Sequence, residues 1–190
     1  CLGLAADGPR PHALFDYALG PTLARRIKRE GALPPTEFLP PVRAVAGALD
    51  YLARAGVVHL DIKPGNIVLG DPPRLIDFGL ARTVEEAKRI DKPVGTGRYM
   101  APEQCDPKTL AAMIGPASDI WGLGITLYYA AVGTRPFAKP DPNQGEPEAR
   151  YPQLTLLPPP LPPSVPAPLA ALVYAMLARD PAKRPSAATT

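Results

Sequence analysis

The pattern of apolar and polar positions predicts a chain of helices with a few short strands. Residues 1–4 and 12–18 are short apolar-rich runs, and the residues at 7–9 between them suit a turn, so we expect two strands at the start of the chain. Val57-Val58 predicts a third brief strand, and it leads directly into His59.

Two amphipathic helices are predicted after the first strands. Leu23 and Ile27 stand four apart among arginines and lysines, which predicts a short helix with a solvated basic face. A longer helix is predicted over residues 36–54, with one apolar stripe formed by Val42, Val45, Leu49 and Leu52. Because proline lacks the backbone donor, Pro40-Pro41 means that the regular helix either starts there or is kinked.

The second half of the chain contains a core helix and a proline-rich segment. Residues 119–132 are apolar nearly all round, so this helix should lie in the core, with Trp121 as a core residue. Residues 140–168 hold 11 of the 28 prolines, so this segment cannot be regular helix. It could serve as a ligand for a proline-binding domain, although a stiff connector is the favoured interpretation. Apolar residues between 169 and 177 predict a final helix.

A hairpin is predicted near the middle of the chain. The apolar runs at 67–69 and 75–76 flank residues 70–73, which suit a turn. If these runs pair as antiparallel strands, Asn66 and Asp77 fall at the same open end, about 5 Å apart as cross-strand neighbours. A carboxamide and a carboxylate both offer the hard oxygen ligands that Mg²⁺ takes alongside phosphate oxygens.

Asp61 and Lys63 lie just before this hairpin. They are two residues apart, so in an extended loop their side chains point to the same side. The arrangement puts a potential proton acceptor, a fixed cation and two metal ligands around one small volume. Such a set of groups indicates a phosphoryl-transfer site.

Composition excludes few classes of protein. An apolar content of 46% and a charged content of 21% are typical of a globular chain, and 190 residues suffice for one domain. A net charge of +3 is mild, and we expect no nucleic-acid partner. We find neither a membrane-spanning run nor a signal-peptide pattern. Cys1 and Cys105 form no metal-binding pattern, so we expect reduced thiols in a cytoplasmic protein.

Three motifs carry a resemblance to a known family. H-L-D-I-K-P-G-N at residues 59–66 resembles the catalytic loop of protein kinases, and D-F-G at 77–79 matches their metal-binding motif. A-P-E follows at 101–103, at the family's distance. Three motifs in order are far more specific than any one alone. Lys63-Pro64 resembles the serine/threonine branch, and the Ala-, Pro- and Arg-rich style resembles bacterial members.

The resemblance implies catalytic roles and cofactors. Asp61 would accept or orient the proton of a substrate hydroxyl, and Lys63 would offset charge on the transferred phosphoryl group. Asn66 and Asp77 would hold Mg²⁺ across the phosphates of ATP. Thr96 would bond the catalytic loop and favour Ser or Thr acceptors. The implied cofactors are ATP and Mg²⁺, and the implied partner is a protein substrate with a Ser or Thr acceptor.

The resemblance also implies an adenine site. Phe15 would stand at the back of the ATP pocket, and Asp16, Tyr17 and Ala18 would form the hinge whose backbone groups bond adenine. Val68 would pack beneath the adenine ring. An ordinary hairpin with a core phenylalanine is the alternative interpretation of residues 1–18.

Supporting residues follow from the same comparison. His59 would pack against Phe78, and we assign it no proton transfer. Asp119 resembles the aspartate that holds the catalytic-loop backbone, since a buried acid should find hydrogen-bond donors. Glu103 of A-P-E would form a buried pair with Arg184.

One departure from the family concerns regulation. Leu60 replaces the arginine that usually precedes the catalytic aspartate and grips a phosphate on the activation segment. Between Asp77 and Glu103 the only hydroxyl residues are Thr83, Thr96 and Tyr99. We therefore expect that phosphorylation of the activation segment is not the switch.

The expected fold is α+β and protein-kinase-like. Residues 19–190 would form a mainly helical C-terminal lobe with short β-hairpins, and residues 1–18 would be a remnant of the N-terminal lobe sheet. The phosphate-covering glycine-rich loop, the β3 lysine and the αC glutamate are absent from this sequence. We therefore expect a truncated domain with weak nucleotide binding and little turnover by this chain alone.

Three functions remain open at this point. The leading hypothesis is a protein serine/threonine kinase that transfers the γ-phosphoryl group of ATP. A pseudokinase that binds or scaffolds partners is disfavoured, because Asp61, Lys63, Asn66 and Asp77 are all retained. A small-molecule phosphotransferase is disfavoured by Glu103 and the Gly95-Thr96 segment, which in the family shape a platform for protein substrates.

Overall fold

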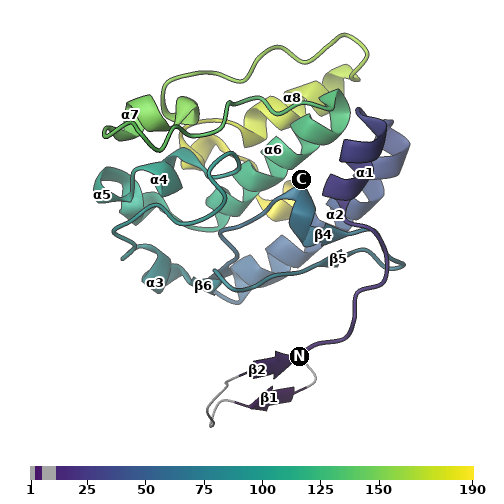
Figure 1. Cartoon of the computed structure of the whole chain (residues 1–190), viewed down its shortest axis with the longest axis horizontal. Helices are drawn as coiled ribbons and strands as arrows, with labels where there is room; N and C mark the ends of the chain where they lie inside the picture. The colour runs from purple at the N-terminus through teal and green to yellow at the C-terminus, as the bar shows by residue number, and fades with distance from the viewer. Residues whose placement is uncertain (1–2, 6–11) are drawn as a thin grey trace.

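A buried helix, α6 (Pro116–Val132), runs through the helical body of the protein (Figure 1). The computed structural model describes residues 3–5 and 12–190. Thirteen of the residues of α6 are buried, and α2 (Pro35–Arg54) and α8 (Ala167–Met176) pack against it. Trp121 is 1% exposed. The prediction of an all-round apolar core helix is therefore confirmed.

The helices before α6 follow the predicted pattern closely. α1 (Leu23–Glu30) buries Leu23 and Ile27, and Gly31 ends it with a φ of 77°. α2 starts at Pro35, so the alternative that its regular part begins at Pro40-Pro41 is wrong. Both prolines lie inside the helix, whose apolar stripe faces the core.

The strands of the described residues form three separate antiparallel pairs. β4 (Ile67–Val68) pairs with β5 (Arg74–Leu75), which confirms the predicted hairpin, although its second strand begins one residue earlier than expected. β3 (Val57–Val58) pairs with β6 (Arg82–Thr83), a strand that the sequence did not predict. The pairs are short, so packing of the helices accounts for most of the core.

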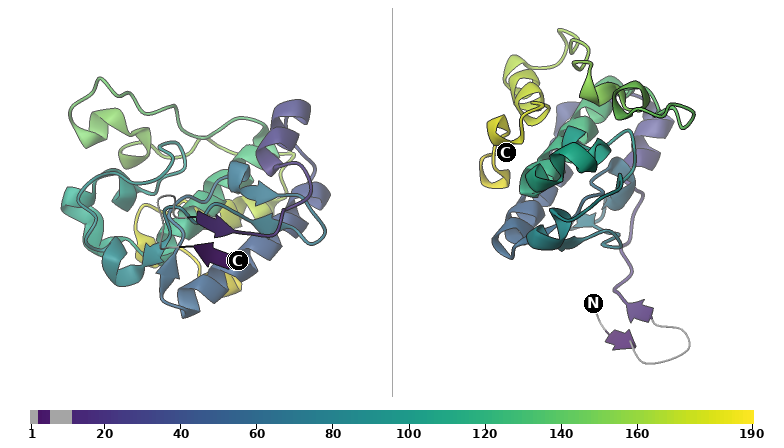
Figure 2. Two further views of the ribbon diagram at one scale, coloured as in Figure 1. Left: turned by 60° about the horizontal axis from the view of Figure 1, so that its bottom comes forward. Right: turned by 90° about the vertical axis from the view of Figure 1, so that its left-hand side faces the viewer.

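The first pair of strands stands away from the helical body (Figure 2). β1 (Gly3–Ala5) pairs with β2 (His12–Leu14) as predicted, but the second strand ends at Leu14, not at residue 18. Residues 15–19 form no regular element and lead to α1. The predicted turn at residues 7–9 lies outside the described residues.

Short helices fill the segments between the long ones. Each spans one turn, and they are α3 (Val84–Ala87), α4 (Pro102–Cys105), α5 (Pro107–Leu110) and α7 (Pro147–Arg150), with 3₁₀ turns at Pro64–Asn66, Ala111–Met113, Pro152–Leu154, Pro181–Lys183 and Ala187–Thr189. α7 is a single helical turn inside residues 140–168, the segment that was predicted not to be regular helix. Its Pro147 occupies the first helical position, where the missing N–H of proline costs nothing.

The second half of the proline-rich segment is irregular, as predicted. Between the 3₁₀ turn that ends at Leu154 and the start of α8 at Ala167, the chain forms no helix or strand. The N–H of Leu161 donates to the Tyr174 hydroxyl at 2.6 Å, which ties this stretch to α8. In the described part of the chain, a membrane-spanning length is reached only by Pro107–Met113 and α6 together, a pair bent by 104°, and by no single helix.

Candidate active site

Asp61, Lys63 and Thr96 form one hydrogen-bonded cluster. Lys63 Nζ lies 2.5 Å from Asp61 Oδ2 and 2.8 Å from Thr96 Oγ1. Thr96 donates to Asp61 Oδ1 twice, from its backbone N–H at 3.0 Å and from its hydroxyl at 2.7 Å. The side chain of Asp61 is only 7% exposed. The predicted proton acceptor, cation and threonine therefore lie together, and each of them holds the other two in place.

Asn66 completes this cluster from the 3₁₀ turn Pro64–Asn66. Its Nδ2 donates to the backbone carbonyl of Asp61 at 2.9 Å and contacts Asp61 Oδ2 at 3.3 Å. The backbone carbonyl of Asn66 accepts from Ile76 N–H at 2.9 Å, so Asp77 follows directly at the open end of the β4–β5 hairpin. The two predicted metal ligands thus flank the hairpin at its open end, Asn66 just before β4 and Asp77 two residues after β5.

Gly95 lets the loop bring Thr96 to Asp61. Its φ is 126°, and a Cβ there would lie 2.9 Å from the Leu60 carbonyl oxygen, so only glycine fits. Gln104 fixes the same approach, because its Nε2 donates to the carbonyls of Leu60 and Val94, each at 2.9 Å. The sequence analysis missed Gln104. A signal was its place directly after A-P-E.

Asp119 of α6 holds the backbone of the catalytic loop by hydrogen bonds. Asp119 Oδ2 accepts from His59 N–H and Oδ1 accepts from Leu60 N–H, each at 2.8 Å. Burial raises the pKa of Asp119 to about 7, and the two backbone donors oppose that rise. Leu60 is held with a φ of 65°, a left-handed conformation that is unfavourable for a leucine. The predicted contact between Asp119 and the loop is present.

His59 occupies a packing position. Its ring centre lies 4.9 Å from that of Phe78, as the sequence predicted, and its side chain is buried. Nε2 lies 3.2 Å from the Ile76 carbonyl, and Nδ1 accepts from Asp61 N–H at 3.3 Å, which fits a neutral ring protonated on Nε2. Desolvation lowers the pKa of His59, so the neutral form dominates at pH 7.

A cavity of about 660 Å³ lies between residues 15–18 and the segment 74–79. Phe15, Asp16 and Ala18 line it, and Asp77 and Phe78 lie on the opposite side. Phe15 is 63% exposed, so it does not close the cavity as a buried back wall would. Its volume is within the range of small-molecule sites, about 300–1,000 Å³.

Val68 is not among the residues that line this cavity, and its predicted packing beneath adenine stays a prediction. It is 4% exposed, and the wall on its side is formed by residues 74–79. Tyr17, the middle residue of the predicted hinge, is 84% exposed and also lies off the wall.

The donor set near the cavity fits Mg²⁺. Asp77 is exposed and has a φ of 65°, and among the described residues its Oδ1 accepts a hydrogen bond only from the N–H of Gly79, at a long 3.4 Å. Residues at functional sites often adopt such sparsely populated conformations. The described residues offer no group of three or more His, Cys, Asp or Glu for a metal. Mg²⁺ suits a site of this kind, since it binds through one or two protein oxygens and completes its shell with phosphates and water.

Glu103 and Arg184 form the predicted buried pair. Arg184 Nη1 and Nη2 donate to the two carboxylate oxygens at 2.6 and 2.9 Å, and both side chains are at most 1% exposed. Ser118, which the sequence analysis also missed, donates to Glu103 Oε1 at 2.7 Å. The pair ties the A-P-E segment to the segment after α8, and Ser118 ties it to the start of α6, so the loop that carries Thr96 is anchored at its far end.

Comparison with known proteins agrees with this geometry. The protein kinase domain model matches residues 3–190. The chain is 37% identical over 175 residues to the probable serine/threonine-protein kinase PkwA of Thermomonospora curvata, covering 90% of this chain and 22% of PkwA. It is 33% identical over 182 residues to the serine/threonine-protein kinase PknA of Mycobacterium tuberculosis, covering 94% of this chain and 40% of PknA. The chain thus spans less than half the length of these curated relatives, and it belongs to the protein kinase domain family.

Proposed function

We propose that this protein transfers the γ-phosphoryl group of ATP to Ser or Thr hydroxyls of protein substrates. The observation that carries the proposal is the cluster of Asp61, Lys63 and Thr96, in which a buried carboxylate and an ammonium lie 2.5 Å apart. Both relatives described above carry the words serine/threonine-protein kinase in their names. Protein kinases as a family use ATP and Mg²⁺.

The residues of the cluster divide the work by chemistry. Asp61 accepts or orients the proton of the acceptor hydroxyl, and Lys63 stabilises negative charge that builds on the transferred group. Thr96 and Asn66 fix the Asp61 carboxylate, so that it needs no reorganisation during the reaction. Mg²⁺, when bound, supplies charge neutralisation at the phosphates. Asp77 and Asn66 are the residues that would hold it.

The proposal is tested with the intact natural polypeptide that contains this chain. We expect transfer of radiolabel from [γ-³²P]ATP to Ser or Thr of a protein substrate, identified by phosphoamino-acid analysis. Asp61→Asn keeps the shape of the side chain but removes the proton acceptor, so it should lower kcat about 10²–10⁴-fold. Asp77→Asn should raise the Mg²⁺ concentration needed for half-maximal rate.

A matched control keeps the result specific. Asp50 pairs with Arg54 on the surface of α2, so Asp50→Asn makes the same chemical change away from the site and should leave kcat unchanged. Equal activity of wild type and Asp61→Asn would refute the assignment. Binding of ATP with no transfer by the wild type would favour the scaffold alternative.

A further inference from the structure

A basic hollow lies beside the catalytic cluster. It has a volume of about 540 Å³, and its walls include residues 95–100, Arg135, Lys139 and Pro140. Arg98, Arg135 and Lys139 give it three cationic side chains, and no described carboxylate lines it. The space is large enough for a side chain of a bound peptide. The hollow therefore presents positive charge without an internal partner.

The arginines are held by groups other than acids. Arg135 Nε donates to the Tyr99 hydroxyl at 2.8 Å, and its guanidinium lies 4.1 Å from the ring centre of Tyr129. Arg98 Nε is buried and has no hydrogen-bond partner in the part of the chain that the structure describes. Among the described residues, no carboxylate lies within 4.0 Å of a charged nitrogen of Arg98, Arg135 or Lys139. An anion entering the hollow would meet cations that nothing else neutralises.

The wall of the basic hollow is fixed before any ligand arrives. Gln153 is buried, and its Nε2 donates to the carbonyls of Gly97 at 2.8 Å and Met100 at 3.1 Å. A Cβ on Gly97 would lie 2.6 Å from Pro140 Cγ, so the loop presses directly against the opposite wall. A rigid site loses little conformational entropy on binding, which favours recognition.

Thr96 connects the basic hollow to the chemistry. It is a wall residue, and its backbone N–H and hydroxyl both donate to Asp61 Oδ1. An extended peptide advances about 3.3–3.6 Å per residue. A substrate whose acceptor hydroxyl meets Asp61 would therefore place a side chain over the hollow within about three residues of the acceptor.

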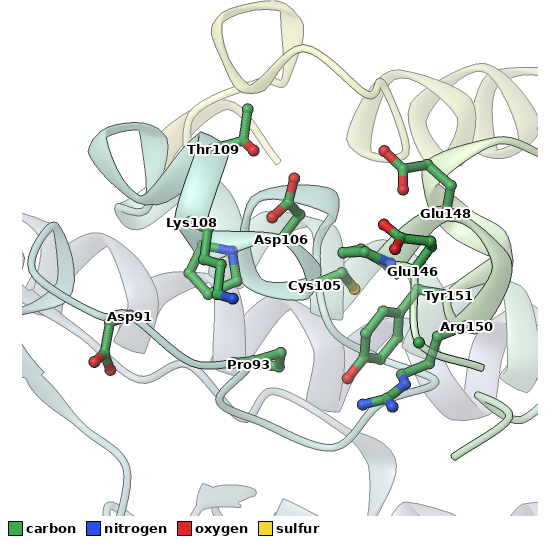
Figure 3. A pocket seen from close by; sticks show the side chains of 13 residues that line it. Asp91, Pro93, Cys105, Asp106, Lys108, Thr109, Glu146, Glu148, Arg150 and Tyr151 are labelled. Carbon is green, nitrogen blue, oxygen red and sulfur yellow. The ribbon is translucent and has the colours of Figure 1, made fainter. Parts of the chain in front are cut away.

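A second hollow next to the first has the opposite charge. It has a volume of about 460 Å³ and shares Pro93 and Tyr151 with the basic hollow. Figure 3 shows the charged side chains around it, which are Asp91, Asp106, Glu146 and Glu148 against Lys108 and Arg150. An anionic side chain is thus attracted to one hollow and repelled by the other, which favours a single register for a bound substrate.

We propose that the basic hollow selects protein substrates with an anionic side chain within about three residues of the acceptor Ser or Thr. The anion is a carboxylate of Asp or Glu or the phosphate of an already phosphorylated residue. Arg98 and Lys139 are the specificity-determining residues, and Arg135 adds charge from a position fixed by tyrosines. The inference rests on the proposed kinase function, because it places the acceptor at Asp61.

The test uses synthetic nonapeptides with a central Ser in a neutral background and the intact natural polypeptide. One Glu, phosphoserine, Gln or Lys is moved through each position from four residues before to four after the acceptor. We expect kcat/KM to be about tenfold higher for Glu than for Gln at one or two positions within three residues of Ser, mainly through KM. The preference should shrink as salt is raised. Comparison of Glu with phosphoserine distinguishes the two sources of the anion.

Charge-reversed variants locate the effect. Lys139 is exposed, so Lys139→Glu should fold, and with Arg98→Glu it should remove the Glu preference and favour Lys at the same position. Lys92→Glu is the matched control, because Lys92 is exposed in the loop that also carries Arg98 but lies off the wall of the hollow. That control should keep the preference for Glu.

A binding measurement separates this inference from the proposed function. Labelled peptides with Ala in place of Ser cannot be phosphorylated, and fluorescence anisotropy should show tighter binding of the Glu peptide than of the Gln peptide. If the Glu peptide binds more tightly but no peptide is phosphorylated, the proposed kinase function is overturned and the proposed selection of anionic side chains by the basic hollow is supported. Phosphoryl transfer with equal kcat/KM for the Glu and Gln peptides at every position would overturn the proposed role of the basic hollow. A Glu preference that is equal at all positions, or that is lost in Lys92→Glu, would overturn it as well.

Discussion

The buried pair of Glu103 and Arg184 gives the largest stability prediction. All five guanidinium N–H groups of Arg184 are used, since two meet the Glu103 carboxylate and the others meet the carbonyls of Ala117, Ala178 and Arg179 at 2.8–3.0 Å. The substitution Arg184→Met removes every one of these bonds. It leaves a buried carboxylate with Ser118 as its remaining side-chain donor.

The magnitude follows from the burial of both charges. Breaking a buried pair by removing one partner costs about 3–5 kcal/mol, because the other charge stays uncompensated. A domain of this kind has a total unfolding free energy of about 5–15 kcal/mol. Each single variant, Arg184→Met or Glu103→Gln, should therefore lose a large share of its stability. The double variant Glu103→Gln/Arg184→Met has no orphaned charge. We expect its loss to fall short of the sum of the singles by at least about 2 kcal/mol.

Urea unfolding measures these losses directly. Trp121 is the only tryptophan of the sequence, and the Arg184 guanidinium lies 5.1 Å from its ring centre, so its fluorescence reports on this part of the core. Far-UV circular dichroism provides a second probe. Lys88→Met, which breaks an exposed pair with Glu85, is the control and should cost less than about 1 kcal/mol. Single-variant losses as small as that control, adding without coupling, would refute the reasoning.

Three further predictions concern the loop and its supports. Burial raises the pKa of Asp119 from 3.8 to about 7, so the stability contributed by the protonated Asp119 carboxyl is fully present below pH 3.8 and is lost as pH rises through 7. In urea titrations the unfolding free energy of the wild type should fall by about 2 kcal/mol relative to Asp119→Asn between pH 5 and 7. Parallel pH dependences of the two proteins would contradict this. A Cβ at Gly122 would lie 2.8 Å from the Ile62 carbonyl oxygen, so Gly122→Ala should lower the unfolding free energy by about 1–3 kcal/mol and lower kcat. A Cβ at Gly47 would meet nothing within 4 Å among the described residues, so Gly47→Ala should stabilise α2 by about 0.5–1 kcal/mol. Thr83 caps α3 together with Glu86, so Thr83→Ala should lower the unfolding free energy by about 1 kcal/mol without abolishing kinase activity. Loss of activity in this variant, with phosphate mapped on Thr83 beforehand, would show that phosphorylation of Thr83 is the activating switch.

The predictable parts of the fold are those with a strong local pattern. Residues 119–132 are apolar on every side, and only a core position satisfies such a helix. The β4–β5 hairpin has two apolar runs around a turn-forming segment. The partners of Glu103 and Asp119 were predicted from motif resemblance. The sequence itself does not show that Arg184, 81 positions after Glu103, comes within 2.6 Å of it in space.

The unpredicted parts depend on contacts between distant segments. β6 consists of Arg82 and Thr83, which show no strand pattern and pair with β3 only because the loop returns there. Gln104 and Gln153 each tie loops together through backbone carbonyls, and a buried glutamine has no distinguishing sequence signal. The neighbours of Val68 likewise do not show which strand of the hairpin lines the cavity beside residues 15–18.

Leu60 has a packing role in the structure. Where the family usually has an arginine that grips a phosphate, Leu60 is buried in an apolar cluster with Val58, Ala87, Ile90 and Ile114. Two of these residues belong to the segment between Asp77 and Glu103, so the loop that carries Thr96 is held against the catalytic loop by apolar contact. Such contact needs no phosphate and is present as soon as the chain folds. In the structure, α6 supports the catalytic loop through Asp119, and Leu60 is one of the apolar contacts between that loop and the segment that carries Thr96.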